Sequence, residues 1–320
     1  MKICVVGAGA IGGWVAARLA LAGNDVSVLA RGETLSSIET EGLLVTEQGE
    51  TCSVAVAAAP DPAALGRQDV VVIALKAPAL LQIASSLRPL IAPETLIVPM
   101  LNGVPWWFLA EPLQSGDPGG ETAAALPTDQ VVGCVVHASC FRSAPNQVTV
   151  KHAEKLILGD PAGGPGKRVE RVRILFEDAG IRSEASDNIR RAVWYKLWGN
   201  ATINPLSALS RATADQLLDD PVIRAFMAEA MDELAAVGAA IGCPIGESAE
   251  DRMAVTARLG AFKSSMLQDV EAGRPIELEA LLGAPRELAR RVGVATPSLD
   301  LLYAMTAGLA RSLGLDKTRG

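Results

Sequence analysis

Three polar residues at intervals of four, Lys196, Asn200 and Asn204, stand in the segment Tyr195–Leu206. On an α-helix this spacing places all three side chains on one face. The segment is otherwise rich in bulky apolar residues, so a solvated surface stripe is the weaker interpretation. A lysine that is partly shielded from water can serve as an acid, and carboxamides can bind polar groups of a small molecule. The pattern therefore indicates a site for acid catalysis on a polar substrate.

A second pattern with chemical meaning begins the chain. The apolar residues 3–6 are typical of a buried strand, residues 14–20 are typical of a helix, and a G-x-G-x-x-G motif joins them. That motif is Gly7, Ala8, Gly9, Ala10, Ile11 and Gly12. Gly7 suits a tight turn, Gly9 lets backbone approach a pyrophosphate, and Gly12 lets the helix pack closely on the strand. Because the full strand–loop–helix context is present, a dinucleotide site is favoured over a glycine-rich turn that binds nothing.

The end of the second predicted strand, residues 25–29, indicates which dinucleotide is bound. In NAD-binding proteins an acidic residue there holds the ribose 2′-hydroxyl. Here the strand ends in Ala30-Arg31, and the nearest acid is Glu33. An arginine suits a 2′-phosphate, so the sequence predicts NADP(H), with a surface arginine that binds no ligand as the alternative.

Two further polar residues follow predicted strands. Lys76 comes after residues 69–75, and Asn102 comes after residues 95–100. In an open parallel sheet, ligands bind beyond the carboxyl ends of the strands. We therefore expect Lys76 near the cofactor phosphates or the substrate. Asn102 could reach the nicotinamide end of the cofactor, or it could form a plain Asn-Gly turn with Gly103.

Taken in order, these motifs resemble the ketopantoate reductase family over nearly the whole chain. The set is Gly7–Gly13, Lys76, Asn102-Gly103, Lys196-Leu197-x-x-Asn200-x-x-x-Asn204-Pro205-Leu206, Ser264–Asp269 and Glu277. The resemblance implies NADPH-dependent reduction of a 2-oxo acid, 2-dehydropantoate, in pantothenate synthesis. It also implies a cytoplasmic oxidoreductase.

The resemblance also implies roles for individual residues. Lys196 is implied to be the general acid, and Glu277 to orient the lysine and the reacting oxygen. Ser265 is implied to bind the substrate carboxylate, and Asn200 and Asn204 the other polar groups of the substrate. Asn102 is implied to contact both cofactor and substrate. Arg31 and Lys76 are implied to bind the NADP phosphates, beside the glycine loop.

Three departures from the family pattern affect the substrate assignment. The residues after Gly103, Val104–Phe108, are bulkier than usual, Glu279 and Leu282-Gly283 stand where the family often has Asp and Asn-Gly, and Pro285 interrupts a predicted helix. A paralogous reductase or dehydrogenase for another 2-oxo acid therefore remains an alternative. A protein that senses NADP without catalysis is a third interpretation, but it would need neither Lys196 nor Glu277.

The predicted fold is α/β, with an N-terminal Rossmann-type doubly wound sheet in residues 1–185 and a C-terminal all-helical domain in residues 186–320. Helices are expected at 79–90, 167–179, 186–204, 221–242, 250–272, from 276 onward and at 298–313. Pro205 is expected to end or kink one of them. Further short strands are expected near 42–45, 52–56, 131–136 and 148–158. Residues 114–128 are expected to form a mobile loop.

The composition restricts the partners. The 320 residues carry a net charge of −7 without a long basic run, which argues against nucleic acid, and no apolar run is long enough for a membrane span. Five scattered cysteines suggest free thiols in a reducing cytosol. The two histidines stand in no metal motif, so we expect no metal. A small 2-oxo acid is the expected partner, and a homodimer stays open.

Overall fold

The computed structural model describes residues 1–164, 166–258 and 260–316. By contacts between Cα atoms the chain divides into two units. Unit 1 contains Met1–Leu101 and Gly120–Ala192, and unit 2 contains Asn102–Gly119 and Val193–Gly320. This grouping differs from the predicted single boundary between residues 185 and 186, because the segment 102–119 makes its contacts with the helices of unit 2.

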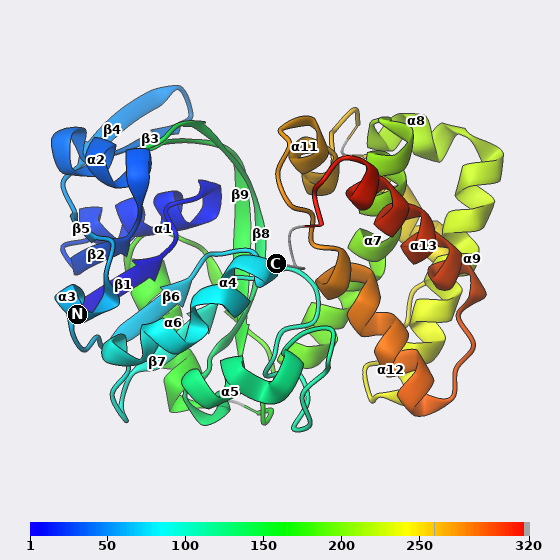
Figure 1. The fold of residues 1–320 in the computed structure, drawn as a ribbon, viewed down its shortest axis with the longest axis horizontal. Coiled ribbons are helices and arrows are strands. Elements are labelled where there is room, and N and C mark those ends of the chain that lie inside the picture. Colours follow the sequence, from blue (N-terminus) through cyan, green and yellow to red (C-terminus); the bar gives the residue numbers. More distant parts are fainter. Residues whose placement is uncertain (165, 259, 317–320) are drawn as a thin grey trace. The chain divides into compact units, whose positions relative to one another are not determined.

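Unit 1 is built on a five-stranded parallel sheet in the order β5-β2-β1-β6-β7 (Figure 1). Its strands are β1 (Lys2–Val6), β2 (Asp25–Leu29), β5 (Ala57–Ala59), β6 (Val70–Ile73) and β7 (Leu96–Pro99). Ile3–Val6 of β1 and the whole of the neighbouring β6 are apolar and buried, as expected for a parallel sheet covered on both faces. The predicted Rossmann-type fold is confirmed.

A second sheet in unit 1 contains the remaining strands in the order β10-β9-β3-β4, with β8 paired to β9. These are β3 (Leu43–Glu47), β4 (Glu50–Val54), β8 (Gly133–Ala144), β9 (Gln147–Gly159) and β10 (Ser183–Ala185). The 13-residue β9 pairs with β3 at its start and with β10 at its end. The sequence predicted most of these strands, but it did not predict that they form a separate sheet.

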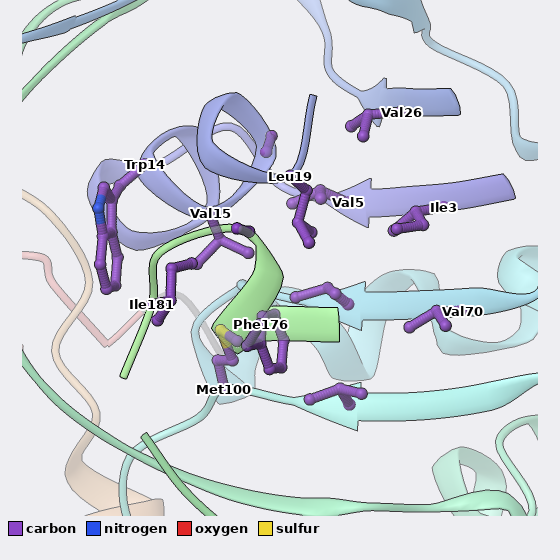
Figure 2. Close-up of a cluster of buried hydrophobic side chains, with 14 of the residues drawn as sticks. Ile3, Val5, Trp14, Val15, Leu19, Val26, Val70, Met100, Phe176 and Ile181 are labelled. Atoms are coloured by element: carbon purple, nitrogen blue, oxygen red, sulfur yellow. The ribbon is translucent and has the colours of Figure 1, made fainter. Parts of the chain in front are cut away.

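Helix α1 (Ala10–Leu21) packs between the two sheets and contacts strands of both. Its side chains join one continuous apolar core with the parallel strands and with α6 (Lys167–Asp178). Figure 2 shows members of this core, among them Ile3, Val5, Val15, Leu19 and Phe176. The glycine loop that precedes α1 is therefore fixed by a helix whose packing is defined on two sides.

Shorter helices complete unit 1. They are α2 (Gly32–Glu41), α3 (Pro62–Leu65), α4 (Ala77–Ile83), α5 (Glu121–Ala125) and the 3₁₀ turns η1 (Ala84–Leu90) and η3 (Thr128–Gln130). The 3₁₀ turn η2 (Pro118–Gly120) contains the chain position at which unit 2 passes into unit 1. The predicted helix over 79–90 is thus an α-helix followed by a 3₁₀ turn that contains Pro89. The loop predicted over 114–128 contains η2 and α5, because the Glu-Thr-Ala-Ala-Ala run of α5 favours a helix despite its glycine-rich surroundings.

Unit 2 is helical apart from its connecting segments. Its helices are α7 (Ile189–Ser210), α8 (Ala214–Asp219), α9 (Pro221–Ala240), α10 (Ala249–Ala257), α11 (Ser265–Glu271), the π-helix η4 (Glu279–Gly283), α12 (Ala284–Val292) and α13 (Pro297–Ser312). In the part of the chain that the structure describes, none of the helices combines the length and apolarity that a membrane crossing needs.

Two helix predictions in unit 2 are wrong. Residues 250–272 form two helices, because Gly260 adopts a φ of +68° and Ser264 caps a new start by accepting a 3.1 Å hydrogen bond from the Leu267 amide. Helix α7 does not end at Asn204 but continues through Pro205 to Ser210. Proline removes one backbone hydrogen bond, and the burial of this part of α7 outweighs that loss.

Candidate active site

The glycine loop has the geometry that its motif predicts. Gly7 has a φ of +99°, and a Cβ there would lie 2.6 Å from a side-chain carbon of Leu75. A Cβ on Gly12 would collide with the carbonyl oxygen of Gly7. Beside Gly9, in contrast, a Cβ would meet nothing within 4 Å. Gly7 and Gly12 are therefore required by packing, whereas Gly9 leaves open space where a ligand could approach the backbone.

The same loop leads into the N-terminus of α1. Gly9 is the N-cap residue and, having no side chain, offers no side-chain cap to the amide groups of the first turn, which contains Ala10 and Ile11. Within the described residues those N–H groups receive no side-chain cap, and the positive end of the helix dipole lies there. A phosphate fits both features, so the loop suits a dinucleotide.

Arg31 and Lys76 follow the strands on either side of β1. Arg31 comes just after β2 and is exposed, while Lys76 follows β6 and is half-buried. Because β2, β1 and β6 are adjacent and parallel, the glycine loop and both cations lie at the same edge of the sheet. This placement matches the predicted binding of phosphate groups, and the specific role of Arg31 on a 2′-phosphate stays a prediction.

Lys196, Asn102 and Glu277 form one hydrogen-bonded set in unit 2. Lys196 Nζ donates to Asn102 Oδ1 over 3.0 Å, and Asn102 Nδ2 donates to Glu277 Oε2 over 3.5 Å. Lys196 is half-buried, and Glu277 is 7% exposed. The carboxamide thus lies between a cation and a carboxylate, with its oxygen toward the former and its nitrogen toward the latter. In the sequence, Asn102 precedes Lys196 by 94 positions and Glu277 by 175 positions.

Close backbone packing holds the segments of Asn102 and Glu277 together. Gly103 has a φ of +78°, and a Cβ there would lie 2.6 Å from the carbonyl carbon of Ala280. The next residue, Val104, donates its backbone N–H to the Ala280 oxygen over 3.2 Å. Ala280 belongs to the π-helix η4, and such irregular turns occur often at functional sites. The Asn-Gly pair is therefore a precise backbone contact rather than an ordinary exposed turn.

Two tryptophans fix the orientation of α7. Trp194 Nε1 donates to the Leu234 carbonyl over 3.1 Å, and Trp198 Nε1 donates to the Met231 carbonyl over 2.7 Å. Both rings are fully buried against α9. From 3.6 residues per turn, they lie on the far side of α7 from Lys196. The tryptophans therefore do not lie around Lys196. They attach α7 to α9, and Lys196 lies on the opposite face of α7.

The substrate-binding candidates are only partly brought together. Asn204 is buried, and its Nδ2 donates to Ser265 Oγ over 3.4 Å. Ser265 is exposed at the first turn of α11, and Ser264 reaches the Asn204 carbonyl over 3.5 Å. Asn200 is half-buried and makes no side-chain hydrogen bond with the residues that the structure describes. Asn204 therefore lies beside α11, and the roles of Asn200, Asn204 and Ser265 in substrate binding stay predictions.

Tyr195 has a partner on another side of the helix. Its hydroxyl donates to Glu247 Oε2 over 2.7 Å, and burial is the main cause that raises the pKa of this tyrosine. The Arg252 guanidinium lies 5.3 Å from the ring centroid. Tyr195 is therefore engaged by Glu247, and because adjacent residues of an α-helix lie about 100° apart around its axis, it faces a different side of α7 from Lys196.

The aromatic run after Gly103 is packed inside unit 2. Trp106, Trp107 and Phe108 are 2–6% exposed, and the Phe108 ring lies 6.2 Å from that of Trp194. For Phe108, the contact with Trp194 indicates that the ring packs against α7. Sequence reasoning missed Glu287, which binds the end of the same segment. The two residues whose backbone amides it binds, Gln114 and Ser115, lie more than 170 positions away, so no local pattern could have indicated this contact.

Comparisons with known proteins identify the same family over nearly the whole chain. Residues 3–163 match the family profile described as ketopantoate reductase PanE/ApbA, and residues 188–310 match the profile of its C-terminal part. A 2-dehydropantoate 2-reductase from Mesorhizobium japonicum is 39% identical, over 98% of this chain and 99% of its own.

Solved structures extend the comparison to the fold. A crystal structure from Ralstonia solanacearum MolK2 has a TM-score of 0.95 and 49% identity, covering 98% of this chain and 99% of its own. The 2-dehydropantoate 2-reductase from Methylococcus capsulatus has a TM-score of 0.85 and 32% identity, covering 98% of each chain.

Proposed function

This chain belongs to the ketopantoate reductase family, and we propose that it is an oxidoreductase that reduces 2-dehydropantoate to pantoate with NADPH, a step of pantothenate synthesis. The observation that carries this proposal is the set of Lys196, Asn102 and Glu277. It combines a proton donor, an amide and a carboxylate in direct contact, at positions that match the family pattern.

For the cofactor we propose NADP(H). The residues assigned to it are Gly7, Ala8, Gly9, Ala10, Ile11, Gly12, Arg31, Lys76 and Asn102. The open space beside Gly9, the uncapped start of α1 and the exposed guanidinium of Arg31 support a phosphate-rich ligand. When bound, NADPH supplies the hydride that reduces the keto carbon.

We assign the proton to Lys196. Addition of hydride to a keto carbon leaves negative charge on its oxygen, and that charge needs a positioned donor. Lys196 Nζ carries the proton, and Asn102 and Glu277 hold the amine and the new hydroxyl in place. The chain's two histidines lie on β8 and β9 in unit 1, in a different unit from this set.

Substrate binding is assigned to Asn102, Asn200, Asn204 and Ser265. The hydroxyl of Ser265 would bind the carboxylate of the 2-oxo acid, and the amides would bind its keto oxygen and terminal hydroxyl. The contact between Asn204 and Ser265 supports a shared role. Removal of an amide that pairs with a substrate hydroxyl should reduce discrimination against analogues that lack the hydroxyl.

A panel of 2-oxo acids tests the function directly. The purified protein is mixed with NADPH or NADH, and cofactor oxidation is followed with 2-dehydropantoate and with branched and aromatic 2-oxo acids. The highest kcat/KM is expected for 2-dehydropantoate with NADPH. A much higher value for another 2-oxo acid would identify a paralogous reductase or dehydrogenase. NADPH binding without reduction of any member would identify a sensor.

We place the protein in the cytoplasm. The five cysteines all lie within the described residues and form no disulfide there, which supports a reducing compartment. We also propose that the protein forms a homodimer. Light scattering after size-exclusion chromatography tests this, because it measures whether the molar mass is that of one chain or of two.

A further inference from the structure

Glu287 of α12 binds the segment 102–119, which begins with Asn102. Its Oε1 accepts the backbone N–H of Gln114 over 3.0 Å, and its Oε2 accepts the backbone N–H and the hydroxyl of Ser115 over 2.9 and 2.7 Å. The side chain of Glu287 is only 15% exposed. Hydrogen bonds to a charged acceptor are roughly twice as strong as neutral ones, so this is a strong local attachment.

Arg291 extends the attachment by one helical turn. Its Nη2 donates to Glu287 Oε1 over 2.8 Å and to the Pro112 carbonyl over 2.8 Å. Arg291 Nη1 also lies 3.5 Å from Glu111, but that carboxylate is 90% exposed and such a pair contributes little. The two helix residues therefore grip residues 112–115 together.

The charge state of Glu287 suits this role. Burial raises the pKa of the carboxyl group, but the hydrogen bonds from Ser115, Gln114 and Arg291 lower it by more. The net effect holds the pKa of Glu287 below its ordinary value of 4.5. The carboxylate is consequently ionised at neutral pH, when it accepts all of these bonds.

The other end of segment 102–119 is held by the same stretch of helix. Gly103 and Val104 pack on Ala280 of η4, and α12 follows η4 without a break at Ala284. Between the two ends, Phe108 packs on Trp194 of α7. A rigid helical stretch over residues 279–292 thus fixes both ends of a segment whose middle is buried, so the segment can move little while both attachments hold.

We propose that Glu287 is a positioning residue for the reaction, because its grip on residues 114–115 keeps Asn102 in place between Lys196 and Glu277. This inference rests on the proposed reductase function. Glu287 acts through the segment, so its loss should change the placement of the Asn102 amide. A misplacement of about 1 Å can cost roughly 10²-fold in rate.

The kinetic test compares Glu287→Ala and Glu287→Gln with a matched control. Asp220 also accepts two backbone N–H bonds in unit 2, from Val222 and Ile223 at 2.9 and 3.0 Å, but it caps α9 instead. Glu287→Ala should lower kcat with 2-dehydropantoate by roughly 10- to 100-fold and raise the Kd of NADPH far less, because all the other residues assigned to the cofactor belong to unit 1. Glu287→Gln should retain part of the rate. Asp220→Ala should lower Tm but not kcat.

A double-mutant cycle shows whether Glu287 works through Asn102. If it does, Glu287→Ala should cost little in a protein that already carries Asn102→Ala. A merely structural role would give the same loss in both backgrounds. Additive losses, or a kcat for Glu287→Ala that matches Asp220→Ala, would overturn the positioning role while the reductase function stands.

Amide hydrogen exchange gives a readout that needs no substrate. The Val104 N–H, which donates to Ala280, should exchange faster in Glu287→Gln than in the wild type, and should be unchanged in Asp220→Ala. Unchanged exchange at Val104 in Glu287→Gln would overturn the inference. A wild type that reduces no 2-oxo acid would instead overturn the proposed function, and Val104 exchange would still decide whether Glu287 holds the segment.

Discussion

Lys196 is the residue on which the proposed reaction depends most directly. Its Nζ donates a hydrogen bond to Asn102 Oδ1 over 3.0 Å. The neighbouring Tyr195 faces Glu247 instead, so the two adjacent residues of α7 have different environments. This difference makes Tyr195 a natural control for changes at Lys196.

We expect Lys196→Ala to lower turnover by roughly 10²- to 10⁴-fold, the usual size of a general-acid contribution. The affinity for NADPH should stay nearly unchanged, because the residues proposed to bind its phosphates belong to unit 1. Glu277→Ala should also slow turnover, and the double variant should be less than additive. Steady-state kinetics with Tyr195→Phe as the control checks this. Near-normal turnover of Lys196→Ala would refute the assigned role.

Arg31 carries the prediction for cofactor choice. Arg31→Asp should weaken NADPH binding by about 2–3 kcal/mol, because a charge-assisted contact is lost and a repulsive charge is added. NADH binding should suffer less. Arg67→Asp is the matched control, since this exposed arginine lies just before β6, at the opposite edge of the sheet. Fluorescence titration measures both affinities, and equal wild-type affinity for NADH and NADPH would contradict the prediction.

At the scale of elements, the backbone of Gly103 packs directly against η4, next to Asn102. Gly103→Ala should destabilise the fold by more than the roughly 1–2 kcal/mol expected for a left-handed alanine, because the methyl group meets Ala280. Gly242→Ala is the control, with a φ of +79° and open space around its Cβ. Thermal unfolding compares the two variants. Equal losses of Tm in Gly103→Ala and Gly242→Ala would contradict this prediction, because they would show that η4 shifts to accommodate the methyl group.

The attachment of segment 102–119 to α12 should depend on pH in a defined direction. A carboxyl group whose pKa is lower in the folded than in the unfolded chain stabilises the fold above its unfolded value, and this contribution is lost as the pH falls through the folded value. The pKa of Glu287 is lowered from 4.5. We therefore expect wild type to exceed Glu287→Gln in free energy of unfolding at neutral pH, and the difference to shrink below about pH 4.5.

Urea unfolding at several pH values measures this difference. Glu94→Gln, at an exposed loop position, controls for the loss of one carboxylate. A difference between wild type and Glu287→Gln that stays constant or grows in acid would contradict the sign derived above.

For the whole molecule, local sequence patterns predicted individual strands and helices better than they predicted the contacts between residues distant in sequence. Ile3–Val6 and the glycine loop were recognisable because burial and close packing restrict residue type at each position. Lys196 and Asn204 could be placed on one helix because their spacing follows its period. The contact of Asn102 with Lys196 joins residues 94 positions apart, and no local pattern determines it. The break before Ser264 was missed because it depends on two single residues, Gly260 with its positive φ and Ser264 as the N-cap that starts α11.

The division into two units predicts how a fragment should behave. A fragment of residues 186–320 lacks Phe108, whose burial against Trp194 is worth about 1.5–3 kcal/mol, and leaves Glu287 without its partners. It should be less stable in urea than a fragment in which residues 102–119 are joined to 193–320 by a glycine-serine linker. Equal stability of the two fragments would show that the segment contributes nothing to the helical unit.

The pairing of β9 with β3 also has a consequence for synthesis on the ribosome. Leu44 pairs with Gln147, so one edge of β3 has no partner strand until 103 further residues have been made after Leu44. At about 5–20 residues per second this takes roughly 5–20 s. For that time the nascent chain presents an open strand edge that other chains could join. Chaperone dependence during translation should therefore be greatest before β9 emerges, well before any residue of the proposed catalytic helix has been made.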